Sequence, residues 1–523
     1  MLQESMIEYG YRRIIITMVV MLCAILELLD VTIVNVALND LQGNLGATLT
    51  EVGWVATAYA IGNVIIIPMT SWLSQQFGRT HYFAGSIVLF TICSFLCGQS
   101  NNIFALSVFR FLQGMGGGAL LATSQTIITE IYPTEKRGQA QAIFTLGVII
   151  GPSLGPILGG YIIDNYSWPM IFYINVPLGI IAALLSFQYI RSPQYGSKKS
   201  AREVDWMGIL LLAAAIGSLQ FVLERGQEED WFNSEIITIL SVIAFFGIFF
   251  FIWRELTCTH PIVNLRVLHN KNLLMATILS FIYGFGSYGS TFIVPLFTQS
   301  QLGWPATDAG LLVAVSSISS IFVLPVVTRL NKMGVKPQYL LAAGMLLFAF
   351  NCYWSRNILT PHTDIYTFFT VLLFRYIALN FFVVSISNIA FATIKTNEIA
   401  DGAAFTGMLR QLGGSFGIAV ITTYISRQQV FHRNTLVSHL VNADPAVQHR
   451  LLAVQQSFQG KGMPVNIAVK SSYKLLDISV NQQATILSYM DVYLAVSMLF
   501  LLAVPFVLLT KSAHKSAPAA DLH

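Results

Sequence analysis

The chain has 523 residues, 55% of them hydrophobic and only 10% charged, with a formal net charge of +4. Soluble domains carry about 25% charged residues, and a single soluble core could not hide this much apolar surface. The composition therefore excludes an ordinary soluble protein and favours a bilayer environment. The small net charge gives no reason to expect a nucleic-acid partner.

Fourteen apolar runs are long enough to span a bilayer as helices, for which about 17–25 residues are needed. They lie at about 14–36, 51–73, 81–100, 103–128, 139–163, 169–190, 206–223, 236–254, 273–297, 307–330, 338–355, 365–394, 402–425 and 488–510. We therefore predict an all-α membrane protein with 14 transmembrane helices.

The first run contains two carboxylates, Glu27 and Asp30, which lie three residues apart and therefore share a helix face. An ionised carboxylate near the centre of a membrane costs about 2.5–3.5 kcal/mol, whereas a protonated one costs far less. One of the pair is therefore a predicted proton site. The alternative is that both are paired structural acids.

The fourth run carries Arg110, followed one turn later by Gln113. Because an arginine keeps its charge, Arg110 must find an anion or carbonyl groups within the membrane. Its predicted depth matches that of Asp30, so we predict an Asp30–Arg110 or Glu27–Arg110 pair that makes proton uptake switchable. A purely structural clamp is the alternative for Arg110. Gln113 is a candidate for the same polar network or for substrate contact.

The fifth run has glycine at every fourth position, together with two prolines. These residues are Gly147, Gly151, Pro152, Gly155, Pro156 and Gly159. Such a stripe lets another helix approach closely, and the prolines remove backbone donors and bend the segment. We predict a bendable contact at which this helix rocks against its neighbour, with ordinary tight packing as the alternative.

The segment 191–205 is the main predicted linker, and the chain on its two sides contains a weak repeat. Arg375 in the twelfth run corresponds to Arg110, and Gly413 corresponds to Gly151. This register requires the seventh and eighth runs to be an inserted pair. Repeated halves around a central binding site are a common plan of secondary transporters.

The repeat predicts the domain organisation. Residues 1–190 form the first six-helix half, and 191–272 hold the linker, the inserted pair and the loop after it. Residues 273–511 form the second half, and 512–523 are a polar tail. The polar segment 426–487, with helix-like patches such as "PAVQHRLLAVQQSF", is expected to face outward as a loop between spans, either as a docking element or as a solvated hairpin.

The second half carries further polar groups inside its predicted spans. They are Arg375, Asn380, Asn388, Arg410 and Gln411. Each is a candidate for substrate contact or for hydrogen bonds between helices, and the sequence leaves both roles open.

The basic residues predict the orientation in the membrane. With the N-terminus inside, eighteen Lys and Arg lie in inner segments and only two lie in short outer loops. Short cytoplasmic loops carry such an excess, so both termini are predicted to be cytoplasmic.

Motifs of several other function classes are missing from the sequence. It has no GxxxxGK[ST] loop for ATP, no His or Cys cluster for a metal and no nucleophile motif. We therefore expect no catalytic site, no cofactor and no metal, and an energy source other than ATP.

Five segments, in this order and over nearly the whole chain, resemble the fourteen-span major facilitator superfamily drug:proton antiporters of the EmrB/QacA type. The segments are "LDVTIVNVALN", "RFLQGMGGG", "GVIIGPSLGPILGG", "WPMIFYINVPLG" and "LERGQEEDWF". The resemblance implies a major facilitator fold of two six-helix halves plus an inserted helix pair. It also implies export of hydrophobic, often cationic small molecules in exchange for protons across a bacterial inner membrane.

Two further features enter through this resemblance. Gly78 and Arg79 fit the superfamily's cytoplasmic loop motif between the second and third helices, although Ser71 departs from it. In bacteria with two membranes such exporters often work with a periplasmic adaptor and an outer-membrane channel. The resemblance makes 426–487 a candidate contact for such a partner.

Two other functions remain open at this point. One is a proton-coupled transporter of a specific metabolite or nutrient, against which the Gly/Pro stripe of the fifth run argues. The other is a membrane receptor or assembly subunit without net transport, against which the repeat and the buried acids and arginine argue.

Overall fold

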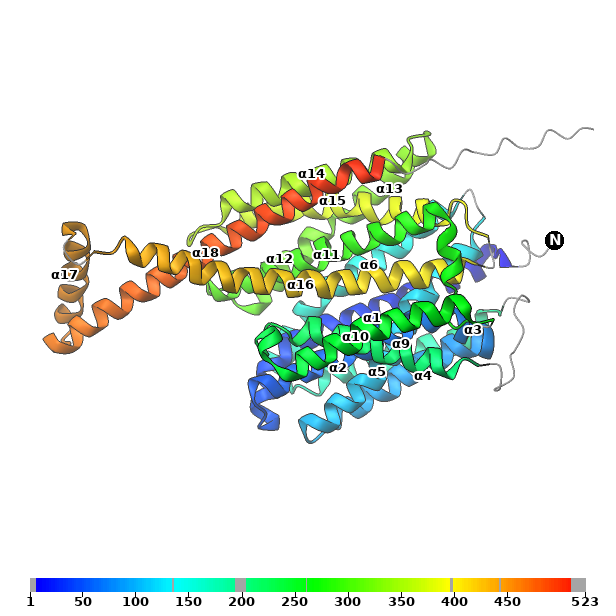
Figure 1. Cartoon of the computed structure of the whole chain (residues 1–523), viewed down its shortest axis with the longest axis horizontal. Coiled ribbons are helices and arrows are strands. Elements are labelled where there is room, and N and C mark those ends of the chain that lie inside the picture. The colour runs from blue at the N-terminus through cyan, green and yellow to red at the C-terminus, as the bar shows by residue number, and fades with distance from the viewer. Residues whose placement is uncertain are drawn as a thin grey trace, which may run out of the picture.

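A computed structural model describes residues 6–133, 136–192, 204–259, 261–395, 398–441 and 444–508. Most of the predicted linker, at 193–203, and the whole predicted tail, at 512–523, lie outside the described residues. Within these ranges the chain is a bundle of long helices with one helical extension at one end (Figure 1). The all-α prediction is confirmed.

Each of the fourteen apolar runs is helical in the structure. The helices are Gly10–Leu45 (α1), Leu49–Ile66 and Thr70–Phe77 (α2, α3), Arg79–Gly98 (α4), Ile103–Ile131 (α5), Arg137–Asn165 (α6), Met170–Tyr173 and Asn175–Tyr189 (α7, α8), Trp206–Arg225 (α9), Glu235–Thr257 (α10), Lys271–Ser300 (α11), Ala306–Ser317 and Ser319–Lys332 (α12, α13), Pro337–Ile358 (α14), Ile365–Phe391 (α15), Ile399–Ser438 (α16), Pro445–Gly460 (α17) and Val465–Leu508 (α18).

Twelve regions of the described chain are long and apolar enough to cross a membrane. The predicted count of 14 is therefore plausible but not exact by this criterion, because α14 and α16 fall outside these twelve. Both contain more polar residues, yet both lie within the bundle: α14 packs on α15 and α18, and α16 packs on α11.

Three predicted spans are each broken into two helices. Between α2 and α3 lies a short 3-10 helix, Ile67–Met69, whose Pro68 has no backbone N–H to donate. The breaks between α7 and α8 and between α12 and α13 are single residues, Ile174 and Ile318, with helical backbone angles. Two more 3-10 helices, Trp231–Asn233 and Leu265–His269, precede α10 and α11.

The helices pack as two groups, α1–α8 and α11–α18. In the first group α6 lies along α1, and α5 lies against α2 and α4. In the second group α16 lies along α11, and α14 against α15 and α18. The groups meet where α6 packs on α12 and α13, and where α16 packs on α3 and α5. The packing of α16 and α6 therefore sets how the two groups touch.

The inserted pair, α9 and α10, lies against both groups. Phe221 of α9 packs on Trp54 of α2, with ring centroids 5.2 Å apart. On its other side, the Gln220 amide donates to the Ser415 hydroxyl of α16 at 2.7 Å. In contrast, α10 exposes one apolar face, including Phe245 and Phe249, as expected of a surface that meets lipid.

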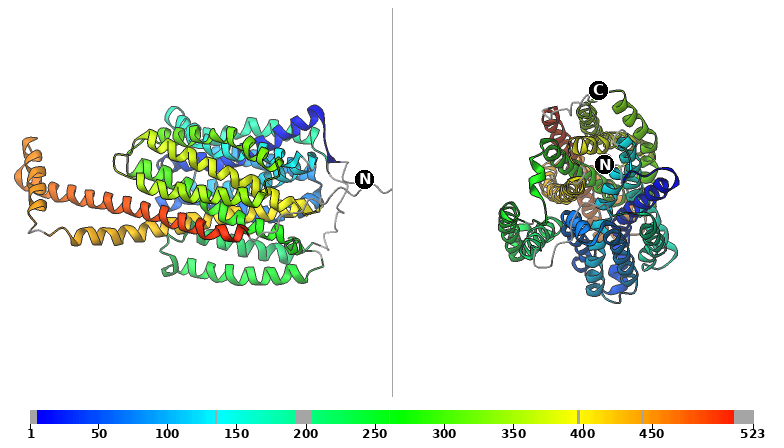
Figure 2. Two further views of the ribbon diagram at one scale, coloured as in Figure 1. Left: turned by 90° about the horizontal axis from the view of Figure 1, so that it is seen from above. Right: turned by 90° about the vertical axis from the view of Figure 1, so that its right-hand side faces the viewer.

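The predicted outward segment at 426–487 is mostly helical, and its helix-like stretch "PAVQHRLLAVQQSF" is α17. Helix α16 continues to Ser438, α17 occupies Pro445–Gly460, and α18 already begins at Val465. These segments project beyond the bundle as an arm, with α17 at its tip (Figure 2). Low hydropathy led to the loop prediction, but a helix outside the membrane needs no apolar run.

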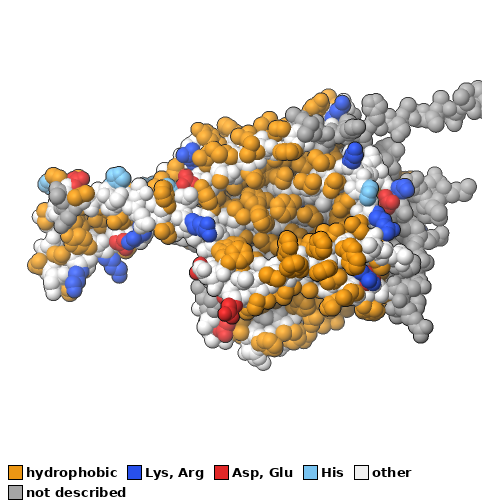
Figure 3. Space-filling model, viewed as in Figure 1, with side chains coloured by type: hydrophobic (Ala, Val, Ile, Leu, Met, Phe, Trp, Pro, Cys, Tyr) orange, Lys and Arg blue, Asp and Glu red, His pale blue; other side chains and the backbone are white. Residues whose placement is uncertain are grey.

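The surface of the bundle is mainly apolar. Hydrophobic side chains cover most of the face seen in Figure 3, and Lys and Arg gather near the N-terminal end of the bundle and on the arm. We call these two ends of the molecule the N-terminal end and the arm end.

Candidate functional site

Asp30 of α1 and Arg110 of α5 form a buried ion pair inside the first helix group, with side chains 0% and 1% exposed. The carboxylate has two more donors: Gln113 Nε2 and Asn175 Nδ2 reach Asp30 Oδ1 at 2.9 and 2.7 Å. Gln113 Nε2 also donates to the Ser94 hydroxyl at 2.7 Å. One carboxylate thus ties together α1, α5 and α8, and through Gln113 also α4.

Arg110 reaches further helices. Its Nε donates to the carbonyl oxygen of Val55 in α2 at 3.1 Å, and its Nη1 donates to Gln113 Oε1 at 2.9 Å. The guanidinium also lies over the rings of Tyr59 and Phe172, at 4.2 and 5.7 Å from their centroids. Cation–π contacts of this kind are strongest where water is excluded. Arg110 is therefore held by two hydrogen bonds to neutral groups, by two aromatic rings and by one carboxylate, that of Asp30.

Glu27 does not pair with Arg110, so that alternative is wrong. Its Oε1 accepts a hydrogen bond from Asn63 Nδ2 of α2 at 2.9 Å, and its Oε2 is buried without a hydrogen-bond partner among the described residues. Side chains three residues apart on a helix point about 60° apart and lie one turn apart along it, so Glu27 and Asp30 reach different neighbours from the same face. Glu27 instead interacts electrostatically with Arg410 of the second helix group.

Several residues of this network were missed in the sequence. Asn63, Ser94 and Asn175 each lie in an apolar run, where a buried amide or hydroxyl needs a partner. The position of each polar residue inside an apolar run was the signal available in the sequence. The sequence did not show which of these groups would reach the Asp30 carboxylate.

The glycine stripe of α6 lies on α1. A Cβ atom at Gly147 would meet the carbonyl of Met21 at 3.3 Å, and one at Gly151 would meet Leu28 Cβ at 3.0 Å. A Cβ at Gly155 would clash with the Thr32 hydroxyl. The stripe thus allows the backbones of α6 and α1 to approach closely.

The far end of the stripe continues the same contact and adds another. A Cβ at Gly159 would come within 3.0 Å of Ile33 of α1. Pro152 and Pro156 both lie inside α6, and a Cβ at Gly310 of α12 would meet Pro156 at 2.7 Å. One side of α6 thus packs within its own group, and Pro156 lies against α12 of the other group.

The second helix group uses glycine in the corresponding place. A Cβ at Gly417 of α16 would meet the carbonyl of Phe285 in α11 at 2.7 Å, and one at Gly413 would clash with the Phe281 carbonyl. Helix α16 thus packs on α11 through glycines, as α6 packs on α1.

Arg79 and Glu130 form a second buried ion pair, at the N-terminal end. Arg79 begins α4 and donates from both terminal nitrogens to Glu130 near the end of α5, with Nη2 at 3.1 Å from Oε1. Gly78 precedes it with φ +80°, a conformation that favours glycine. The loop motif is therefore joined to α5 through Glu130, which sequence reasoning missed.

The other predicted polar residues of the second group do not form one site. Arg375 donates to the carbonyl of Ser290 at 2.9 Å, and Asn380 donates to the Ser320 hydroxyl at 2.8 Å, both between helices. Asn388 of α15 is half-buried close to α6, and Gln411 is half-buried on α16. For Asn380 the interhelical hydrogen bond is the role that the structure supports.

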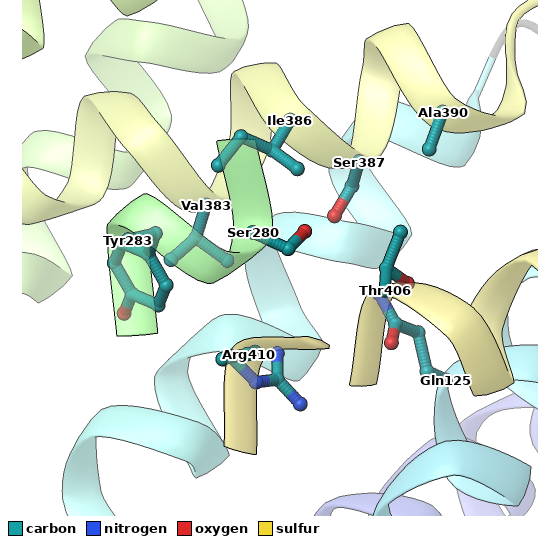
Figure 4. Close-up of a pocket in the computed structure, with 9 residues that line it drawn as sticks. All are labelled: Gln125, Ser280, Tyr283, Val383, Ile386, Ser387, Ala390, Thr406 and Arg410. Carbon is teal, nitrogen blue, oxygen red and sulfur yellow. The ribbon is translucent and has the colours of Figure 1, made fainter. Parts of the chain in front are cut away.

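Arg410 lines a cavity between the two groups (Figure 4). Gln125 of α5 comes from the first group and the remaining walls from α11, α15 and α16. The lining residues are Gln125, Ser280, Tyr283, Val383, Ile386, Ser387, Ala390, Thr406 and Arg410. In this conformation its volume is about 20 Å³, which is room for one water molecule.

Two helix groups with matching glycine contacts, buried ion pairs inside apolar spans and a cavity between the groups define a helical membrane transporter. The chain belongs to the Major Facilitator Superfamily, which it matches over residues 20–418.

Two similar proteins align with most of the chain. It is 32% identical over 498 residues to the fatty acid resistance protein FarB of Neisseria gonorrhoeae, covering 95% of this chain and 96% of the relative. It is 32% identical over 464 residues to the multidrug export protein EmrB of Escherichia coli K12, covering 88% and 89%.

Solved structures agree with the fold. The proton:xylose symporter XylE superposes with a TM-score of 0.59 at 14% identity, over 95% of this chain and 96% of that structure. The human organic anion transporter MFSD10 gives a TM-score of 0.58 at 12% identity, over 94% and 100%. At these identities the likeness concerns the fold alone.

Proposed function

We propose that the protein is a proton-coupled exporter of hydrophobic small molecules, amphipathic cations among them, that works by alternating access. The names of its relatives support export. The observation that carries the coupling is the ion pair between Asp30 and Arg110 in the interior of a transporter fold. A carboxylate there can exchange its arginine partner for a proton.

In the proposed cycle a proton reaches Asp30 and cancels the charge that attracts Arg110. The hydrogen bonds that Asp30 accepts from α5 and α8 then weaken, because a neutral acid is a poorer acceptor than a carboxylate. Helices α1, α5 and α8 are thereby free to shift against one another. Glu27, with one carboxylate oxygen unpartnered, is the second predicted proton site and a counter-charge for a cationic substrate.

The glycine stripe provides the moving contact in this proposal. Because α6 is bare where it meets α1, the two helices can slide without removing side chains from their path. Pro152 and Pro156 allow α6 to bend near the second group. The Arg79–Glu130 pair keeps α4 and α5 together at the N-terminal end, so that the first group moves as one unit.

We place both termini in the cytoplasm and the protein in the inner membrane of a bacterium. The excess of Lys and Arg in the predicted inner segments supports this orientation. The arm formed by α16, α17 and α18 then projects into the periplasm. The protein would meet a periplasmic adaptor and an outer-membrane channel there, and the arm is the proposed contact.

Dye efflux from cells that lack their own pumps tests the function. Cells with the wild-type protein should extrude a lipophilic cation, and a protonophore should stop them. Asp30→Asn should abolish efflux, Glu27→Gln should reduce it, and the exposed Glu235→Gln should leave it unchanged. Unimpaired efflux by the Asp30→Asn, Glu27→Gln double variant would refute the proposed proton sites.

Proteoliposomes separate export from the competing functions. If the protein exchanges dye for protons, the proteoliposomes should accumulate dye under one direction of the pH gradient and not under the opposite direction. Proton-driven uptake of a metabolite without dye movement would favour the nutrient transporter, and neither activity would favour a receptor or assembly subunit.

A further inference from the structure

Arg375 of α15 is a buried arginine, 2% exposed, without a carboxylate partner in the part of the chain that the structure describes. An arginine side chain in a protein does not lose its charge. Its Nη1 donates to the carbonyl oxygen of Ser290 in α11 at 2.9 Å, whereas Nε and Nη2 are buried without a hydrogen-bond partner among the described residues. A carbonyl accepts a hydrogen bond but does not neutralise a full positive charge, and a buried charge without compensation is costly.

The corresponding arginine of the first helix group has a carboxylate partner. Helix α5 packs on α1 as α15 packs on α11, and the sequence repeat pairs Arg110 with Arg375. In the first group α1 supplies Asp30 to Arg110. In the second group α11 supplies to Arg375 only the backbone carbonyl of Ser290. The charge that is balanced in one group is therefore not balanced by any described side chain in the other.

The side chains around Arg375 are neutral. Its guanidinium lies 5.2 Å from the centroid of the Tyr376 ring, whose face attracts a cation but carries no net charge. Cys352 of α14 and Tyr493 of α18 are buried and lie within electrostatic range of Arg375. Ordinary thiols and phenols are uncharged at pH 7. These neighbours therefore leave the positive charge in place.

Two acids of the second group that lie near this region are engaged elsewhere. Asp364 lies eleven residues before Arg375, about 16 Å along the helix, where its carboxylate caps the start of α15. Asp491 of α18 pairs with His432 of α16 at 2.7 Å. Neither carboxylate forms an ion pair with Arg375.

The two unpartnered nitrogens of Arg375 form one edge of the guanidinium. The N–H of Nε and one N–H of Nη2 point in the same direction, and arginines receive anions on such a fork through two parallel hydrogen bonds. The remaining nitrogen, Nη1, is the one that donates to Ser290. Arg375 thus directs a complete bidentate donor edge into the interior of the second group.

The surroundings favour a small spherical anion. Cys352, Tyr376 and Tyr493 belong to one cluster of buried hydrophobic residues. A carboxylate or phosphate would bring further oxygen atoms, and each acceptor that is buried without a donor costs free energy. A halide ion needs no donors beyond those that surround it, and the fork together with a thiol or phenol hydrogen is such a set.

We propose that the Nε–Nη2 edge of Arg375 binds a chloride-sized monovalent anion inside the second helix group. The ion takes the place that the Asp30 carboxylate has in the first group. Its binding does not depend on the proposed transport function. Because the ion binds the folded protein and neutralises a buried charge, it stabilises the fold.

Thermal unfolding of the purified full chain in detergent tests this site. Intrinsic tryptophan fluorescence reports the midpoint while sodium chloride replaces sodium gluconate at constant ionic strength. The midpoint of the wild type should rise by about 2–4 °C and then level off as the site fills. Formate, a planar oxyanion of the same charge, should raise it less than chloride.

Three variants locate the effect. Arg375→Gln should lose the rise, and in gluconate it should unfold at or above the wild-type temperature because no charge is stranded. Arg375→Lys keeps the charge without the fork, so its midpoint should level off only at a higher chloride concentration. Arg433→Gln, which removes a half-exposed arginine of the arm, is the matched control and should keep the wild-type rise.

Bromide gives a direct view of the ion. In crystals of the wild type grown with bromide, anomalous scattering should place the ion within hydrogen-bonding distance of Arg375 Nε and Nη2. A chloride rise that persists in Arg375→Gln, or an equal rise with gluconate, would show that Arg375 is not the anion site. A larger rise with formate than with chloride would overturn the choice of a halide. A wild type that binds chloride but moves no dye would overturn the proposed function and leave the anion site standing.

Discussion

The ion pair between Asp30 and Arg110 gives a quantitative test of the buried network. Replacing one partner by its neutral isostere, as in Asp30→Asn or Arg110→Gln, leaves the other charge buried. Removing one member of a buried pair costs about 3–5 kcal/mol of unfolding free energy. Replacing both removes the stranded charge, so the double variant should be more stable than the two single effects predict.

The contacts of Arg110 narrow the range of unfolding free energy that Asp30→Asn is expected to cost. After Asp30→Asn, Arg110 keeps the Gln113 oxygen at 2.9 Å, the Val55 carbonyl at 3.1 Å and the Tyr59 ring at 4.2 Å. These contacts offset part of the lost charge, so we expect the lower end, about 3 kcal/mol. For the cycle of single and double variants we expect a coupling free energy of at least about 2 kcal/mol.

The buried free cysteines provide the assay. Cys23, Cys93, Cys97 and Cys352 are buried, so a thiol-reactive fluorophore reports unfolding in mixed micelles of increasing dodecyl sulfate content. Single effects that add within about 0.5 kcal/mol would refute the pairing, because independent sites are additive to that extent. Efflux should stay absent in the stabilised double variant, whereas a purely structural clamp predicts its recovery.

Three further outcomes are expected from the same unfolding assay. Gly155→Ala should destabilise by about 1–3 kcal/mol through overpacking against α1, whereas Gly43→Ala, where a Cβ meets nothing, should be neutral or slightly stabilising. Glu130→Gln should cost about 3–5 kcal/mol by stranding its buried arginine, and reversing both charges should recover part of it; no loss would refute the pair. Burial raises the pKa of Asp205 at the start of α9, but the hydrogen bonds from Arg254, the Gly208 N–H and Cys258, together with the charge of Arg254, outweigh burial and hold the pKa below its ordinary value. Its contribution should therefore be complete at neutral pH and disappear as the pH falls through that lowered pKa, and Asp205→Asn should remove this acid dependence.

Helix positions were largely predictable from the sequence. A membrane span is a local property, since about 20 consecutive apolar residues suffice, and each of the fourteen predicted runs is helical over most of its described residues. The all-helical class and the close glycine contact of α6 follow from the same local patterns. Where the chain leaves the membrane this signal disappears, so the polar segment 426–487 showed helix-like patches but not the continuation of α16 and α18 beyond the bundle.

Contacts between distant residues needed the tertiary structure. The predicted depth of Arg110 matched that of Asp30, but the sequence left Glu27 open as its partner, and only the packing of α1 against α5 and α2 gives Asp30 the arginine and Glu27 the amide of Asn63. Asn175 donates a hydrogen bond to the Asp30 carboxylate, although the two residues are 145 positions apart in the sequence.

The sequence by itself determined which segments enter the membrane and which polar residues they carry there, because transfer from water to lipid depends on each segment alone. Only the tertiary structure decided which of these polar groups share a partner and that Arg410 lines a cavity between the two groups. The electrostatic energy of a buried charge depends on the few side chains within hydrogen-bonding distance, and folding selects these from helices far apart in the chain.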